Sequence, residues 1–164
     1  MTSEPLTIYE YLANLKRPEI IIDAEGAVLG RLASYVAKLL LMGFRVHVIN
    51  VEKAVITGDR KMVVASYKLL LEVKTHKNPY RHSPHRPRNP ILIFKKAVKN
   101  MLPKDNWYGR LALKRLRAYI GVPEEFRGKE AIKIVDTLAE TLKRTEYVTV
   151  AEVAKELGWK GIGL

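Results

Sequence analysis

The residues best suited to chemistry lie between Lys74 and Arg88, a segment of unusual composition. It contains five Lys or Arg, three histidines and one tyrosine, and it has no acidic residue. Lysine and arginine neutralise phosphate groups, and tyrosine or imidazole rings can stack on nucleic-acid bases. This combination predicts contact with a nucleic-acid backbone and its unpaired bases.

The net charge of the chain is concentrated around the same segment. Residues 73–117 hold 13 Lys or Arg and one acid, Asp105, so this stretch carries +12, which is the net charge of all 164 residues. So many like charges in one stretch repel each other and oppose folding. A bound polyanion would reduce this repulsion. The predicted RNA-binding residues are Lys74, His76, Lys77, Tyr80, Arg81, His82, His85, Arg86, Arg88, Lys95, Lys96, Lys99, Lys104, Trp107, Arg110, Lys114, Arg115 and Arg117.

Two other uses of the segment compete with this interpretation. A solvated loop would need no partner, but the lack of any acid argues against it. The three histidines His76, His82 and His85 could also be metal ligands, although zinc usually takes four close ligands and the cationic surroundings oppose a divalent ion. We therefore predict no metal site. For Trp107 and Tyr108, stacking on bases and packing against the core both stay open.

Strands and helices alternate before the basic segment. The β-branched run Ile20–Ile22 predicts a strand, and apolar residues at helical spacing from Val28 to Leu40 predict a helix that Gly43 ends. Buried strands are expected around Val46–Val51 and Ala54–Thr57, and a second helix from Met62 to Leu71. This alternation is typical of a layered α/β architecture.

The elements from Lys74 onward must present the basic residues. Three prolines and no apolar periodicity exclude a helix from Lys74 to Arg88, which could reach about 50 Å if fully extended. Asn89 and Pro90 predict a helix start, with Lys95, Lys96 and Lys99 opposite its apolar face. After Pro103 a second basic helix is expected, with apolar positions at Leu113, Leu116 and Ile120.

The two ends of the chain are balanced in charge. We expect an N-terminal arm over residues 1–18, an α/β core over 19–123 and a helical C-terminal extension over 124–164, all within one globular domain. The extension should contain an amphipathic helix from Ile132 to Leu142 and a short helix between Thr149 and Gly158. No cysteine, signal peptide or membrane span is evident, which favours a soluble cytoplasmic protein.

The sequence contains no complete enzyme motif. The turn at Asp23–Arg31 occupies the place of a nucleotide loop but matches neither phosphate-binding motif, so Gly26 is expected to form the turn and Gly30 to allow close helix packing. Gly58–Lys61 is explained by a strand-to-helix turn. We predict no catalytic residues, no cofactor and no small-molecule substrate. A nucleotide-dependent or RNA-modifying α/β enzyme stays as the alternative. A sequence-specific DNA regulator is a lesser one, because Thr149–Gly158 is followed by too few residues for a recognition helix.

Three segments in the right order resemble the L-thirteen family of large-subunit ribosomal proteins. They are Ile21–Ala33, Val48–Gly58, and Val98–Pro103 leading through Gly109 and Arg110 to Leu116–Gly121. The run Ile120–Phe126 is similar to the archaeal and eukaryotic branch of that family. One departure is Asn100, which stands before Met101-Leu102-Pro103 where the family commonly has glycine.

This resemblance implies both a fold and a role. The fold would be a three-layer α/β/α core around a small, mostly parallel four-stranded sheet. The role would be to bind large-subunit ribosomal RNA and support subunit assembly and architecture without catalysis. The partners would be that RNA and neighbouring large-subunit ribosomal proteins, in the cytoplasmic ribosome.

Overall fold

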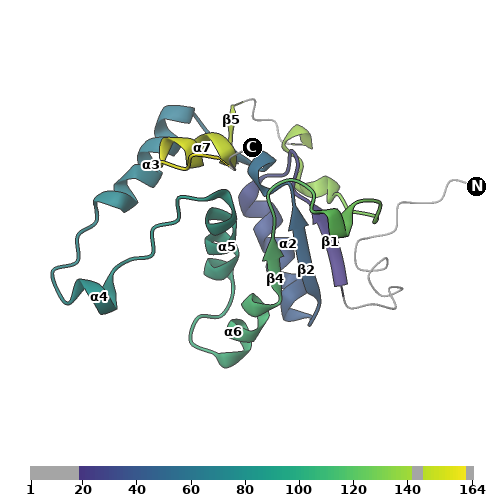
Figure 1. The fold of residues 1–164 in the computed structure, drawn as a ribbon, viewed down its shortest axis with the longest axis horizontal. Coiled ribbons are helices and arrows are strands. Elements are labelled where there is room, and N and C mark those ends of the chain that lie inside the picture. The colour runs from purple at the N-terminus through teal and green to yellow at the C-terminus, as the bar shows by residue number, and fades with distance from the viewer. Residues whose placement is uncertain (1–18, 142–145, 162–164) are drawn as a thin grey trace, which may run out of the picture.

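A small parallel sheet organises the protein. The computed structural model describes residues 19–141 and 146–161, and its sheet has the order β1 (Glu19–Asp23), β2 (Arg45–Ile49) and β4 (Leu116–Ala118) (Figure 1). Both pairings are parallel. The predicted α/β class is confirmed, but the sheet has three strands where four were implied.

Backbone hydrogen bonds explain why the outer edge of β1 gains no full strand. Ile132 forms a single parallel bridge to Ile22. Its N–H donates to the carbonyl of Ile21 at 2.9 Å, and its carbonyl accepts from the N–H of Asp23 at 3.1 Å. The chain then turns away, so the edge is covered by one residue.

One face of the sheet forms the core. Alternate strand residues such as Ile20, Ile22 and Val48 are fully buried against α2 (Leu29–Leu41) and α5 (Pro90–Met101), which contribute Val36 and Phe94 to the same cluster. On the opposite face the described residues provide loops and the 3-10 turn η2 (Glu124–Phe126). Helical packing on this second face, which three layers would require, is not seen among the described residues.

The three predicted glycine roles in the first strand-helix-strand unit have different outcomes. Gly26 has φ +71°, as expected for the turn after β1, and Gly43 has φ +102° after the C-cap residue Met42, as expected for a helix end. Gly30, however, is exposed, and a Cβ there would meet no atom within 4 Å. The expectation that Gly30 allows close helix packing is therefore wrong.

A second, two-stranded sheet joins the C-terminal part to the body. The strands β3 (Val55–Thr57) and β5 (Tyr147–Thr149) pair antiparallel, and η1 (Val51–Lys53) connects β2 to β3. The helix α7 (Val150–Glu156) begins as predicted, because the Thr149 hydroxyl accepts a hydrogen bond from the N–H of Glu152 at 3.3 Å. Val150 and Val153 are fully buried in the main core.

The amphipathic helix predicted from Ile132 to Leu142 is wrong. The described part of this segment contains only the 3-10 turns η3 (Val135–Thr137) and η4 (Ala139–Thr141); Leu142 lies outside the described residues. Its backbone groups are bonded elsewhere, since the carbonyl of Thr137 accepts from Val28 at 2.7 Å and the N–H of Ala139 donates to Gly26 at 3.0 Å. Groups paired with the β1–α2 turn cannot also form a helix.

The second basic helix is shorter than predicted. Helix α6 (Trp107–Lys114) ends before Leu116, which begins β4, and Ile120 lies beyond that strand. The segment pairs with the edge of β2 that β1 does not cover. The N–H of Val46 donates to the carbonyl of Arg115, and the carbonyl of Val48 accepts from the N–H of Tyr119. The predicted N-terminal arm, residues 1–18, lies outside the described residues. No helix in the described part of the chain is both long and apolar enough to span a bilayer.

Candidate nucleic-acid interface

The basic segment forms an arm that projects from the body. Helix α3 (Arg60–Glu72) runs outward, and the chain turns back through the one-turn helix α4 (Pro79–His82) to α5 (Figure 1). The expectation of no helix in Lys74–Arg88 is thus wrong for four residues. Asn78, at φ +42°, accepts a hydrogen bond from the N–H of Arg81, and Pro79 occupies the first helical position, which together stabilise this turn.

The base of the arm is fixed to the body by side chains from the basic segment itself. The guanidinium of Arg86 donates from Nε to the carbonyl of Leu70 at 3.3 Å and from Nη2 to the carbonyl of Val73, at the C-terminal end of α3. Pro87 is buried, and the ammonium of Lys96 donates to the carbonyl of His85 at 3.0 Å. Arg86 therefore acts as a helix cap, which sequence reasoning did not distinguish from RNA binding.

The helices α5 and α6 are held together at the turn between them. The Asn89 side chain caps α5 as predicted, accepting from the N–H of Ile91 at 3.0 Å, and Pro90 is its first residue. Gly109 of α6 is buried against Pro103, where a Cβ would lie 2.0 Å from the Pro103 carbonyl oxygen. Glycine is thus required at 109, whereas Asn100, the departure from the family pattern, is exposed in α5.

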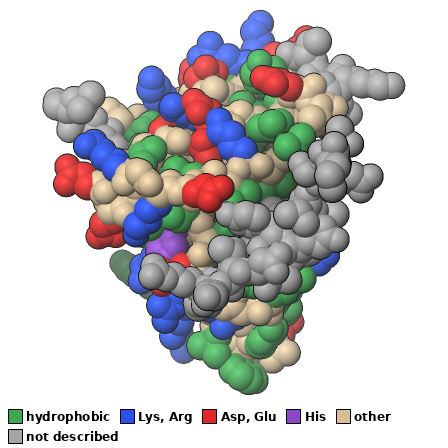
Figure 2. Space-filling model, turned by 90° about the vertical axis from the view of Figure 1, so that its right-hand side faces the viewer, with side chains coloured by type: hydrophobic (Ala, Val, Ile, Leu, Met, Phe, Trp, Pro, Cys, Tyr) green, Lys and Arg blue, Asp and Glu red, His purple; other side chains and the backbone are tan. Residues whose placement is uncertain are grey.

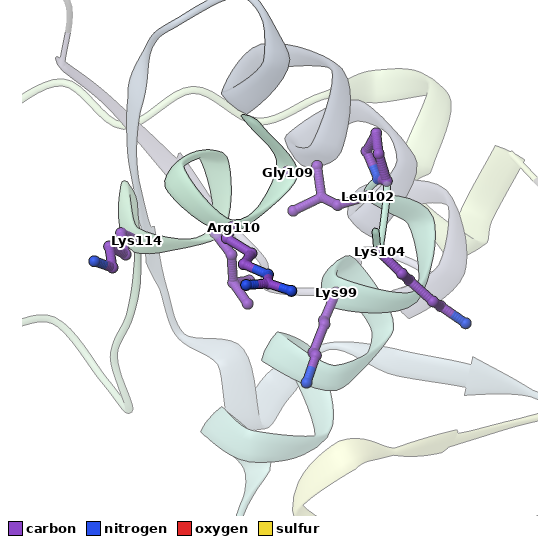
Figure 3. Close-up of a pocket in the computed structure, with 8 residues that line it drawn as sticks. Lys99, Leu102, Lys104, Gly109, Arg110 and Lys114 are labelled. Atoms are coloured by element: carbon purple, nitrogen blue, oxygen red, sulfur yellow. The ribbon is translucent and has the colours of Figure 1, made fainter. Parts of the chain in front are cut away.

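A pocket opens between these two helices. The pocket is lined by four cations and by apolar residues (Figure 3). The lining residues are Lys99, Leu102, Pro103, Lys104, Gly109, Arg110, Leu113 and Lys114. All four of its cations were among the predicted RNA-binding residues. The apolar part of the site was missed; the only signal for it was Gly109 following the Met101-Leu102-Pro103 turn.

Two predicted or candidate binding residues of this region instead cap α2. The Arg115 guanidinium donates from Nη2 to the carbonyl of Leu40 at 2.9 Å, and the Tyr108 hydroxyl donates to the carbonyl of Leu41. The Nε atom of Arg115 is buried without a hydrogen-bond partner among the described residues. Trp107, by contrast, is 68% exposed and contacts Tyr108 edge to face. Of the two aromatic residues, Trp107 is the one available for stacking.

Arg117 does not join the other basic residues. It is exposed on β4 between the buried Leu116 and Ala118, so it lies on the sheet face opposite the helices, in register with His47 of β2. His47 stacks with Tyr119 and contacts Phe126. Burial lowers the pKa of His47 most; the charge of Glu19 raises it, and the charge of Arg117 lowers it further.

Most of the predicted RNA-binding side chains are open to solvent. Four of the eighteen are half-buried: Arg86, Lys95, Lys96 and Arg115. The other fourteen are exposed: Lys74, His76, Lys77, Tyr80, Arg81, His82, His85, Arg88, Lys99, Lys104, Trp107, Arg110, Lys114 and Arg117. Tyr80, at the tip of the arm, is 98% exposed. Of these fourteen residues, eight lie on the arm and four line the α5–α6 pocket, whereas Trp107 at the start of α6 and Arg117 on β4 belong to neither group.

The ion pairs of the described residues lie outside the basic stretch. Their cations are Arg45, Lys53, Arg60, Lys68 and Lys133. Figure 2 shows the face on the right of Figure 1, where Lys or Arg and Asp or Glu side chains are interspersed. No cation of residues 73–117 is paired with a carboxylate in the described part of the chain, so this positive charge is not neutralised by it.

The turn considered as a nucleotide loop is occupied by the protein's own backbone. The N–H groups of Gly26, Ala27 and Val28 donate to the carbonyls of Lys53, Ala24 and Thr137. They are therefore not directed at a phosphate. Gly58 is likewise bonded, to the carbonyl of Glu146, and Asp59 caps α3 through the N–H of Lys61.

The three histidines of the arm are not assembled into a metal site. Within residues 19–141 and 146–161, no group of three or more His, Asp or Glu side chains is placed to hold a metal ion. The arm therefore offers isolated imidazoles.

Comparison with known proteins agrees with the resemblance seen in the sequence. The family model described as ribosomal protein L13 matches residues 17–125. A protein of Saccharolobus solfataricus named large ribosomal subunit protein uL13 is 52% identical over 142 residues, covering 87% of this chain and 94% of its own length. A protein of the same name from Aeropyrum pernix is 48% identical and covers 92% of this chain and 96% of its own length. Another, from Archaeoglobus fulgidus, is also 48% identical and covers 87% of this chain and 89% of its own length. The chain therefore belongs to the ribosomal protein L13 family.

Proposed function

We propose that this protein is a structural constituent of the large ribosomal subunit that binds large-subunit ribosomal RNA and supports subunit assembly. Its role is architectural, without a catalytic step, cofactor or small-molecule substrate. It acts in the ribosomes of the cytoplasm. The balanced surfaces outside residues 73–117 would face solvent or neighbouring ribosomal proteins.

The observation that carries this proposal is the unpaired cationic stretch. Thirteen bases lie within 45 consecutive residues, and fourteen of the eighteen predicted binding side chains are exposed. An RNA backbone supplies the missing negative charge at regular spacing, and release of its counterions favours binding. The relatives are named large ribosomal subunit proteins, which supports large-subunit ribosomal RNA as the proposed partner.

Sucrose-gradient sedimentation of a cell extract tests the location. The protein should sediment with large ribosomal subunits at low salt and leave them only when salt is raised. Sedimentation with small subunits, or as a free protein at every salt concentration, would contradict the proposal.

Binding of the purified protein to large-subunit ribosomal RNA tests the surface. Replacing Arg81 and Arg88 by alanine should weaken binding and reduce the slope of log affinity against log salt by about 1.5, since each phosphate contact contributes about 0.7 to 0.9. Arg86 is left unchanged because it caps α3.

The matched control replaces Lys155 and Lys160, two exposed cations outside the basic stretch, by alanine. This control removes the same charge and should change the slope much less. Equal effects of the two double variants would show that only the net charge matters.

A further inference from the structure

The pocket between α5 and α6 combines features that a backbone-binding surface alone would not need. It is a cavity of about 650 Å³, within the range of about 300–1,000 Å³ that is typical of small-ligand sites. The apolar part of its lining, called the floor below, consists of Leu102, which is 5% exposed, the half-buried Leu113 and the exposed Pro103. Phosphate groups held by the surrounding cations would leave this apolar floor uncovered.

The charged residues that line the pocket are all positive. Lys99, Lys104, Arg110 and Lys114 line it, and none of these cations is paired with a carboxylate in the described part of the chain. Figure 3 shows Arg110 of α6 extending toward Lys99 of α5, while the ends of Lys104 and Lys114 point outward on opposite sides. Lys99 and Arg110 line the same pocket, so their positive charges repel each other, and a bound anion would reduce that cost.

The occupant must therefore have an apolar face and a negative charge. A nucleotide has both, since the flat faces of its base can cover leucine and proline carbons while its phosphates meet the cations. Arginine planes also stack on bases that have left a helix. None of the residues that line the pocket has a carboxylate, amide or hydroxyl side chain that could accept a hydrogen bond from the edge of a base.

We propose that this pocket receives a single nucleotide extruded from an RNA helix. The base is held by its faces against Leu102, Pro103 and Leu113, and the flanking phosphates by Lys99 and Arg110. This inference rests on the proposed RNA-binding function and adds a site that prefers an unpaired base of any identity.

Three RNA duplexes of equal length test it with the full chain, by fluorescence anisotropy at one salt concentration. One is fully paired, one has a bulged uridine, and one has the same bulge without its base. The protein should bind the bulged uridine about fivefold tighter than the abasic bulge, at the lower end of what one stacked base contributes. A fourth duplex, with a bulged adenosine in place of the uridine, should be bound as tightly as the uridine duplex.

Variants separate the pocket from general electrostatics. Leu113→Phe fills the pocket without changing the charge, so the fivefold preference should fall to about one while affinity for the paired duplex is kept. Replacing Lys77 and Arg81 of the arm by glutamine should weaken binding to all three duplexes and keep the preference. Replacing Lys99 and Arg110 by glutamine should weaken binding and abolish the preference, which decides the matter if Leu113→Phe proves unstable in a melting curve.

An abasic bulge bound as tightly as the uridine bulge by the wild type would overturn the pocket assignment. A preference that survives both pocket variants would overturn it as well. Either result leaves the sedimentation and salt-slope tests of ribosomal RNA binding unaffected, so failure of the pocket and failure of the proposed function are distinguishable.

Discussion

Replacing Gly109 by alanine should destabilise the protein, although alanine is normally the better helix former. The added Cβ would lie 2.0 Å from the Pro103 carbonyl oxygen and 3.0 Å from its carbon. Both are backbone atoms, so no side-chain rotation relieves the overlap, and α6 must move away from the turn after α5.

The size of the effect follows from two opposing contributions. Forcing an extra methyl group into a packed site costs about 1–3 kcal/mol, and a backbone contact this close places the cost near the upper end. Alanine recovers about 1 kcal/mol of helix propensity relative to glycine. The expected net loss is about 2 kcal/mol, or a fall in Tm of about 4–8 °C for a chain of this length.

Gly30 provides the matched control within the same fold. It lies in the first turn of α2, and a Cβ there meets nothing within 4 Å. Gly30→Ala should therefore raise the free energy of unfolding by up to about 1 kcal/mol. Urea unfolding and thermal melts of both variants measure the difference. A Gly109→Ala protein as stable as the wild type would refute the close packing of α6 on Pro103.

Two further predictions concern residues whose roles the structure reassigned. Arg115→Met should lower the free energy of unfolding by about 1 kcal/mol, because it removes the charged hydrogen bond to the Leu40 carbonyl but keeps the packing of the side-chain stem. Arg117→Met, at an exposed site, should change the free energy of unfolding by less than about 0.5 kcal/mol. Equal urea midpoints for the two variants would contradict the capping role. Burial is the main cause that lowers the pKa of His47 from 6.5 in the folded protein. The unfolded chain therefore binds a proton at His47 more readily than the folded chain does. The stability contributed by neutral His47 is complete above about pH 6.5 and decreases as the pH falls below that value. Denaturation between pH 7.5 and 5.5 should show this loss in the wild type and a smaller one in His47→Gln; identical pH profiles would count against it.

Much of the fold is predictable from short-range patterns. Alternating burial in β1, the helical spacing of α2, and the caps at Asn89 and Thr149 all describe contacts between residues close in sequence. Such contacts form in the same way in any α/β context. Segregation of charge into residues 73–117 is a property of the sequence itself, and it predicts a binding surface without reference to the fold.

The predictions that failed concern segments whose partners are distant in sequence. Leu116 fits a helical spacing, but β2 offers unpaired backbone groups, and pairing with them makes this segment a strand. Ile132 fits an amphipathic helix, but its N–H and carbonyl bond to β1. Both segments satisfy their backbone hydrogen-bonding groups by pairing with an existing strand. That strand is distant in sequence, so the local pattern of neither segment predicts the pairing.

The order of the residues is enough to place the excess positive charge on one stretch and to predict an α/β body that supports it. Which of these cations stay exposed, and which bind the protein's own backbone, depends on the folded chain. Arg86 and Arg115 are chemically identical to Arg81 and Arg117, yet they reach helix-end carbonyls. The physical reason is distance, because a guanidinium binds whichever acceptor the folded chain places within hydrogen-bonding range, and helix ends leave such acceptors unpaired.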